Sequence, residues 1–105
     1  MHLNIILDEQ NIPIKVPPFV MESGEEFFAR MDADMDKGWQ IARHWVDRPN
    51  TVQRCQIIAD RILGAIENNN EKLAMMMAGY ILSRAPGVKT VHIATDGEIQ
   101  ETELI

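Results

Sequence analysis

The chain has 105 residues, 46% of them hydrophobic and 25% charged, which is the balance of one folded domain rather than a disordered segment. Sixteen acidic residues outnumber ten basic ones, for a net charge of −6, and no basic cluster is visible. Binding to a phosphate backbone needs clustered Lys and Arg, so we expect no nucleic-acid partner. No uncharged stretch approaches the ~20 residues of a membrane span, so we expect no membrane partner.

The first predicted element is a β-hairpin. Residues 3–7 and 12–16 alternate apolar with other side chains on either side of a DEQN turn. Pro13 has no amide hydrogen to donate, so its strand is expected at the edge of a sheet. Pro17 and Pro18 then end the pairing.

A helix over residues 24–47 is predicted next. Ser23 and Glu26 have the spacing of a capping box, in which each side chain bonds a backbone amide at the helix start. Apolar residues recur at steps of three or four along the whole segment, which places them on one face. Pro49 disfavours helical geometry in the residue before it, and therefore marks the break.

Two further helices are predicted, over residues 51–67 and 71–84. Asn50 or Thr51 can cap the first, which carries a long apolar stripe. A run of three asparagines separates the two helices, and the Pro-Gly pair at 86–87 ends the second.

The last predicted element is a second β-hairpin, built around Asp96 and Gly97. An Asp-Gly pair supplies the positive φ angles of a two-residue turn. With such a turn His92 would face Glu101 and form a cross-strand charge pair. The predicted fold class is therefore α+β and helix-dominated, with three helices flanked by N-terminal and C-terminal β-hairpins in a single domain of residues 1–105.

The alternating aspartates in MDADMDKG share the spacing of a calcium-binding loop. An EF-hand loop also needs glycine at position 6 and glutamate at position 12. Counting from Asp32, these positions hold Lys37 and Arg43. The sequence therefore predicts no metal site here, and places the aspartates on the first helix instead.

On that helix Asp34 falls inside the apolar arc, whereas Asp32 and Asp36 fall at its border. A carboxylate covered by apolar groups must find donors or a cation, or else take up a proton. Two hypotheses follow. Asp34 either pairs with an arginine or lies at a wet margin, or it is a perturbed acid in a ligand-binding or partner-binding site.

Arg54 and Arg61 lie seven residues apart along one border of the second helix. Two such arginines can bind a carboxylate or phosphate, or bond Asp34 across the helix interface. Structural ion pairing is the default interpretation because acids are in excess. The alternative function is a small-anion-binding protein or an enzyme, with Arg54 and Arg61 as anchors and Asp34 as acid or base.

Cys55 lies in the middle of an apolar stripe, where an inert, buried thiol is expected. It is the only cysteine, so no intrachain disulfide can form, and the N-terminal segment lacks the basic start of a signal peptide. We therefore expect a soluble cytoplasmic protein. No pattern of metal ligands, catalytic nucleophile or phosphate-binding loop is present, so we expect no cofactor and have no positive support for an enzyme.

The segment LAMMMAGYIL, residues 73–82, carries no charge on any side. Met75 and Leu82 face away from Met76 and Tyr80, so no single surface covers all four. Leaving two large apolar side chains in water forgoes roughly 1.5–3 kcal/mol each. The other predicted elements of one chain offer too little apolar surface to cover this helix on all sides. We therefore expect a homodimer in which Met75 and Leu82 contact the partner.

The function that the sequence favours is a small non-enzymatic interaction or assembly protein that self-associates through apolar helix surface. A separate protein partner stays open as an alternative.

Overall fold

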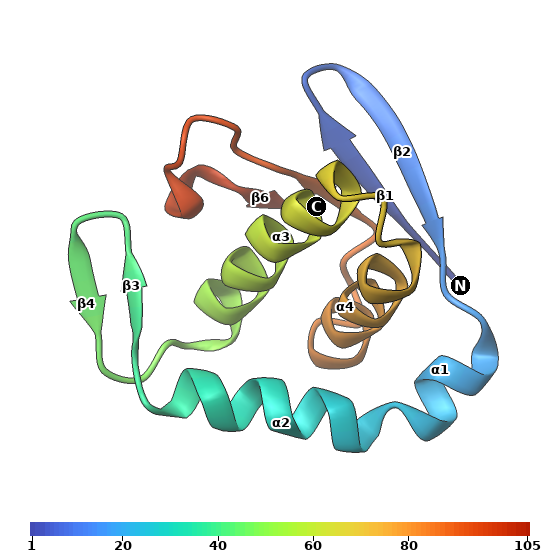
Figure 1. Cartoon of the computed structure of the whole chain (residues 1–105), viewed down its shortest axis with the longest axis horizontal. Helices are drawn as coiled ribbons and strands as arrows, with labels where there is room; N and C mark the ends of the chain where they lie inside the picture. The colour runs from blue at the N-terminus through green and yellow to red at the C-terminus, as the bar shows by residue number, and fades with distance from the viewer.

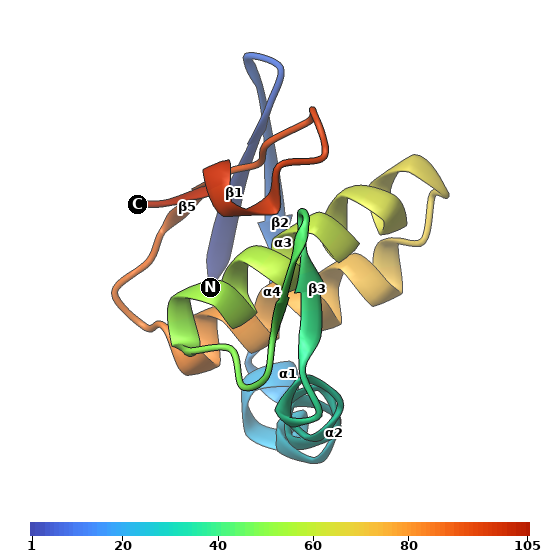
Figure 2. The ribbon, with the colours of Figure 1, turned by 90° about the vertical axis from the view of Figure 1, so that its left-hand side faces the viewer.

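The computed structural model describes all residues from Met1 to Ile105. A pair of long helices lies on one face of a four-stranded sheet, and two shorter helices lie below that pair (Figures 1 and 2). A separate two-stranded ribbon stands beside the long helices. The predicted α+β, helix-dominated fold is confirmed. None of the helices combines the length and the apolar character that crossing a membrane requires.

The sheet has the strand order β2-β1-β5-β6. Its strands are β1 (His2–Leu7), β2 (Gln10–Lys15), β5 (Thr90–His92) and β6 (Glu103–Leu104). Strand β1 pairs antiparallel with β2 and parallel with β5, so the two ends of the chain share one sheet. Asp8 and Glu9 have φ angles of 48° and 69°, as a two-residue type I′ turn requires. The predicted N-terminal hairpin is confirmed, with a tighter turn.

Strand β2 is an edge strand, as Pro13 predicted. Met1 and Val16 exchange both backbone hydrogen bonds, at 2.7 and 3.1 Å. Such pairs alternate along an antiparallel ladder, so Pro13, which lies opposite Asn4, is at a position without these bonds. Its missing donor therefore faces outward, which weakens the open edge as a template for another strand.

The two long helices are α3 (Thr51–Glu67) and α4 (Glu71–Arg84), the residues predicted for them. Asn50 accepts a hydrogen bond from the Gln53 amide and the Gln53 side chain accepts one from the Asn50 amide, both at 2.8 Å. This is a complete capping box. Asn70 caps α4 with its side-chain oxygen.

The predicted helix over residues 24–47 is wrong in its second half. The structure has α1 (Pro18–Ser23), α2 (Glu25–Asp36), and then the ribbon of β3 (Trp39–Ile41) and β4 (His44–Val46). Gly38, with φ of 99°, follows the last turn of α2 in a conformation that residues with a Cβ rarely adopt. Beyond it, tryptophan, isoleucine and valine favour strands.

The predicted capping box at Ser23 is also wrong. Ser23 ends α1, and Gly24 joins α1 to α2 without any side-chain cap. A Cβ at Gly24 would lie 2.4 Å from the Val20 carbonyl oxygen and 2.9 Å from the Phe28 ring. Close packing at the junction therefore decides where α2 begins.

Helix α4 is enclosed by its own chain. Tyr80 and Ile81 are fully buried, with α3 and β2 on two sides. The shorter helices meet α4 at Gly79, where an added Cβ would lie 3.0 Å from the Phe28 ring. The prediction of an enclosed helix is confirmed for residues 77–82, which are all buried, with Leu82 only 4% exposed in the single chain, whereas Leu73, Met75 and Met76 are half-buried.

The C-terminal strands pair in a different register from the predicted one. His92 lies opposite Glu103, not Glu101. Gly97, with φ of 85°, turns the chain inside a longer connection that includes the 3-10 helix η1 (Ile99–Glu101).

That connection is held by α3. The Gln56 side chain donates to the carbonyls of Gln100 and Thr102, at 3.2 and 3.0 Å. The Thr102 hydroxyl in turn accepts a bond from the Ala94 amide at 3.1 Å. These tertiary contacts outweigh the local preference for a tight turn.

Candidate functional site

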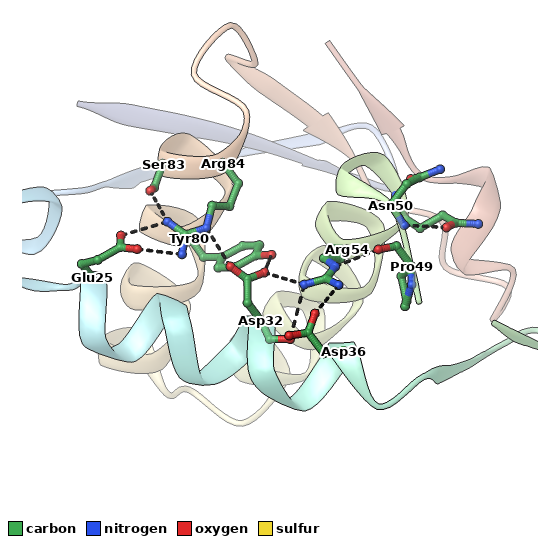
Figure 3. A network of polar contacts seen from close by, with 10 residues as sticks. Glu25, Asp32, Asp36, Pro49, Asn50, Arg54, Tyr80, Ser83 and Arg84 are labelled. Carbon is green, nitrogen blue, oxygen red and sulfur yellow. Dashed lines mark hydrogen bonds and ion pairs between the residues drawn. The ribbon is translucent and has the colours of Figure 1, made fainter. Parts of the chain in front are cut away.

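Asp32, on α2, is the centre of a polar cluster between three helices (Figure 3). Its Oδ1 accepts hydrogen bonds from the Tyr80 hydroxyl at 2.5 Å and from Arg54 Nη1 at 3.1 Å. Its Oδ2 accepts one from Arg84 Nε at 2.9 Å. Because the donors lie on α3 and α4, one carboxylate joins α2 to both long helices.

Both guanidinium groups have further partners. Arg54 also donates to Asp36 Oδ1 at 2.6 Å and to the Pro49 carbonyl at 2.8 Å. Arg84 donates to both carboxylate oxygens of Glu25, each at 2.9 Å, in a bidentate pair. Three carboxylates therefore share two guanidinium groups.

The cluster keeps its groups in their ordinary charge states. Burial raises the pKa of Asp32, but hydrogen bonds from Tyr80, Arg54 and Arg84 together outweigh burial and lower that pKa. Burial, and then the bond to Asp32, raise the pKa of the Tyr80 hydroxyl. Asp32 is thus charged and Tyr80 protonated at neutral pH, so neither is tuned for general acid–base catalysis there.

A hollow of about 510 Å³ opens beside the cluster, lined by residues that include Asp32, Arg54, Tyr80 and Arg84. An incoming anion would have to displace a carboxylate from each arginine while meeting the remaining negative charge. No buried polar side-chain atom lacks a hydrogen-bond partner. We interpret the cluster as a clamp that fixes α2 on the long helices.

Asp34 does not lie where the sequence placed it. It is exposed and forms no ion pair, whereas Asp32 is the half-buried acid. The helix predicted over residues 24–47 places Ile41 and Trp45 on the same side as Asp34, but both belong to the ribbon and not to the helix. Without them the buried face of α2 narrows, and Asp34 falls outside it.

Arg54 pairs with carboxylates of α2, as the structural interpretation expected, although its partners are Asp32 and Asp36. Arg61, two turns further along α3, is exposed and forms no ion pair. Neither Arg61 nor Asp34 lines the hollow beside Arg54. The structure therefore does not assemble the three residues of the alternative anion site.

Of the two expected partner contacts on α4, Leu82 is inside the chain and Met75 is half-buried. Met75 lines a hollow of about 410 Å³ between β2 and the turn from α3 to α4, named here the Met75 hollow. Its apolar lining residues are Ile12, Ile14, Ala65, Ile66, Ala74 and Met75. This hollow contains the accessible side of Met75, whereas the half-buried Leu73 and Met76 of α4 lie outside its lining.

The β3–β4 ribbon was missed by the sequence reasoning. It stands at the left of Figure 1 and crosses in front of the long helices in Figure 2. Trp39, Ile41 and Val46 pack against the core from one face of the ribbon. Because side chains alternate along a strand, Trp45 lies on the other face, where it is 59% exposed.

Trp45 is exposed but held in place. Its Nε1 donates to Asp47 Oδ1 at 3.1 Å, and an added Cβ at Gly38 would lie 2.5 Å from the indole ring. A positioned tryptophan loses little side-chain entropy on binding, and tryptophan is a frequent energetic centre of interfaces. The sequence signal that could have revealed the ribbon is Gly38 followed by Trp39, Ile41 and Val46, residue types that favour strands.

Cys55 is buried, as predicted. Burial, with a smaller effect of the Asp32 charge, raises the pKa of its thiol to about 11. The thiol is therefore protonated and unreactive at neutral pH. No group of three or more His, Cys, Asp or Glu side chains lies close enough to hold a metal ion.

No family model, no curated protein and no solved structure matches the chain. The candidate functional surfaces are therefore those that the geometry itself defines: the outer face of the ribbon at Trp45 and the Met75 hollow.

Proposed function

We propose that this chain is a non-enzymatic interaction protein that self-associates, with the outer face of the β3–β4 ribbon as its main contact. The observation that carries the proposal is Trp45, which is 59% exposed although Asp47 and Gly38 fix its position. Burying a large aromatic side chain is worth roughly 1.5–3 kcal/mol. The exposed part of this side chain contributes such free energy only when a second surface covers it.

The apolar surface of α4 also takes part in this proposal, but a smaller part of it than the sequence suggested. Leu82 is covered within the chain, so α4 offers Met75 and its hollow instead. A homodimer is the smallest assembly that this surface can form. The single buried cysteine supports a reducing, cytoplasmic setting, because no disulfide is available to an oxidising one.

Sedimentation velocity across micromolar concentrations tests the proposal. We expect the wild-type chain to self-associate and Trp45→Ala to weaken the association by roughly tenfold or more, the effect of losing a central interface residue. The matched control is Phe19→Ala, which removes another exposed aromatic side chain, 62% exposed on α1. A wild-type chain that stays monomeric, or equal effects of the two substitutions, would reject the proposal.

A further inference from the structure

We propose that the Met75 hollow receives Trp45 of a second copy of this chain. The inference rests on the proposed self-association and names the receiving surface.

The residues that line the hollows indicate which hollow could receive Trp45. The Met75 hollow has six hydrophobic residues among eleven, in about 410 Å³. A hollow beside His92 has two among nine and five carboxylates, and the one beside Arg54 has one hydrophobic residue among eight. Of these three hollows, only the first offers an indole a mainly apolar surface, and a methionine sulfur beside an aromatic ring adds a favourable contact.

The charges around the two surfaces are also complementary. Lys15 and Glu71 line the hollow, and neither forms an ion pair within the chain. On the ribbon, Asp47 lies beside the indole and Arg43 is exposed without an ion pair. The ribbon therefore carries an acid that can pair with Lys15 and a base that can pair with Glu71, and such pairing favours one docking orientation.

A second copy is needed because one chain cannot make this contact. The ribbon lies at the left of the molecule and β2, which forms one wall of the hollow, at the right (Figure 1). Viewed from the ribbon side, β2 lies behind the ribbon (Figure 2). The contact joins unlike surfaces of two copies and is therefore head-to-tail, so each wild-type dimer keeps one free ribbon and one free hollow and can add further copies.

The test mixes two variants that each lack one surface. Trp45→Ala keeps the hollow, whereas Met75→Gln keeps the ribbon but places an amide in the hollow with little change of side-chain length. We expect each variant alone to associate about tenfold or more weakly than the wild type. The equimolar mixture should form a one-to-one dimer, and the emission of Trp45 should move to shorter wavelength as its indole leaves water.

Two further variants keep the test independent of folding defects. Met76→Gln makes the same change on the next residue of α4, which is also half-buried but does not line the hollow; it should associate like the wild type. Ile14→Thr changes the opposite wall through a residue suited to a strand and should act like Met75→Gln.

The two proposals fail in different ways. If the wild type associates and Trp45→Ala weakens it, but Met75→Gln and Ile14→Thr associate like the wild type, the ribbon binds another surface and only this inference is rejected. A wild-type chain that stays monomeric overturns both.

Discussion

Replacing Asp32 with asparagine tests whether the polar cluster is a clamp. The substitution keeps the shape of the side chain but removes the charge that Arg54 and Arg84 share across α2. The Tyr80 hydroxyl keeps an oxygen to donate to, so the main loss is electrostatic. We expect α2 to hold less tightly to the long helices and the whole domain to become less stable.

The size of the loss follows from how covered the pair is. The side chains of Asp32 and Arg54 are 26% and 13% exposed, which places them between a surface pair and a buried one. Surface pairs contribute about 0–1 kcal/mol, and breaking a buried pair costs about 3–5 kcal/mol. Arg54 and Arg84 keep Asp36 and Glu25, so we expect a loss of about 2 kcal/mol.

Thermal and urea unfolding measure this loss. At about 2.1 cal/mol/K of unfolding entropy per residue, 2 kcal/mol corresponds to a Tm lower by about 9 °C. Folding lowers the pKa of Asp32. The charge of Asp32 therefore stabilises the fold fully at any pH above the pKa of this group in the unfolded chain, about 3.9. That stabilisation disappears as the pH falls through the folded-state pKa, so the Asp32→Asn deficit should shrink below about pH 4.

Asp34→Asn is the matched control, on the same helix two residues away. Asp34 is exposed and unpaired, so its substitution should change stability by less than about 0.5 kcal/mol. Equal losses for the two variants, or an Asp32→Asn deficit that persists unchanged in acid, would refute the clamp.

Three further predictions concern single positions. Gly38→Ala should lower the free energy of unfolding by about 1–3 kcal/mol and alter the emission of Trp45, because Gly38 has φ of 99° and its added Cβ would clash with the indole. An unchanged melting curve would argue against that strain. Ala42→Gly should stabilise the chain by about 0.5 kcal/mol, because Ala42 has φ of 53°, which glycine adopts without strain. Ala29→Gly, inside α2, should instead destabilise it by up to about 1 kcal/mol. Denaturant unfolding of the two variants measures both changes in stability. Cys55 should react with a thiol reagent only as fast as the protein unfolds, since its thiol is buried with a pKa of about 11, and rapid labelling of the native protein would contradict its placement.

Local signals in the sequence were enough where several of them agreed. For α3 and α4, capping asparagines, apolar periodicity and a Pro-Gly stop all indicated the same boundaries, and the structure has those boundaries. Pro13 likewise predicted an edge strand, because a missing amide donor excludes the centre of a sheet. Each of these signals acts between residues that are close along the chain.

Periodicity failed for α2 because the apolar residues of the ribbon continue the spacing of the helix before it. A helical stripe and a short ribbon both need apolar side chains, and only contact with the core distinguishes them. The sequence therefore marked Asp34 as the covered acid, when packing made it Asp32.

The tertiary structure alone decided the partners of Asp32. Arg54 and Arg84 lie 22 and 52 residues further along the chain, and they meet Asp32 only because two helices bring them to the same carboxylate. In the same way, α1, α2, α3 and β2 together cover α4, including Leu82, which no count along one helix can show. Sequence periodicity indicates which face of a helix needs cover, while the packing of distant elements determines what provides it.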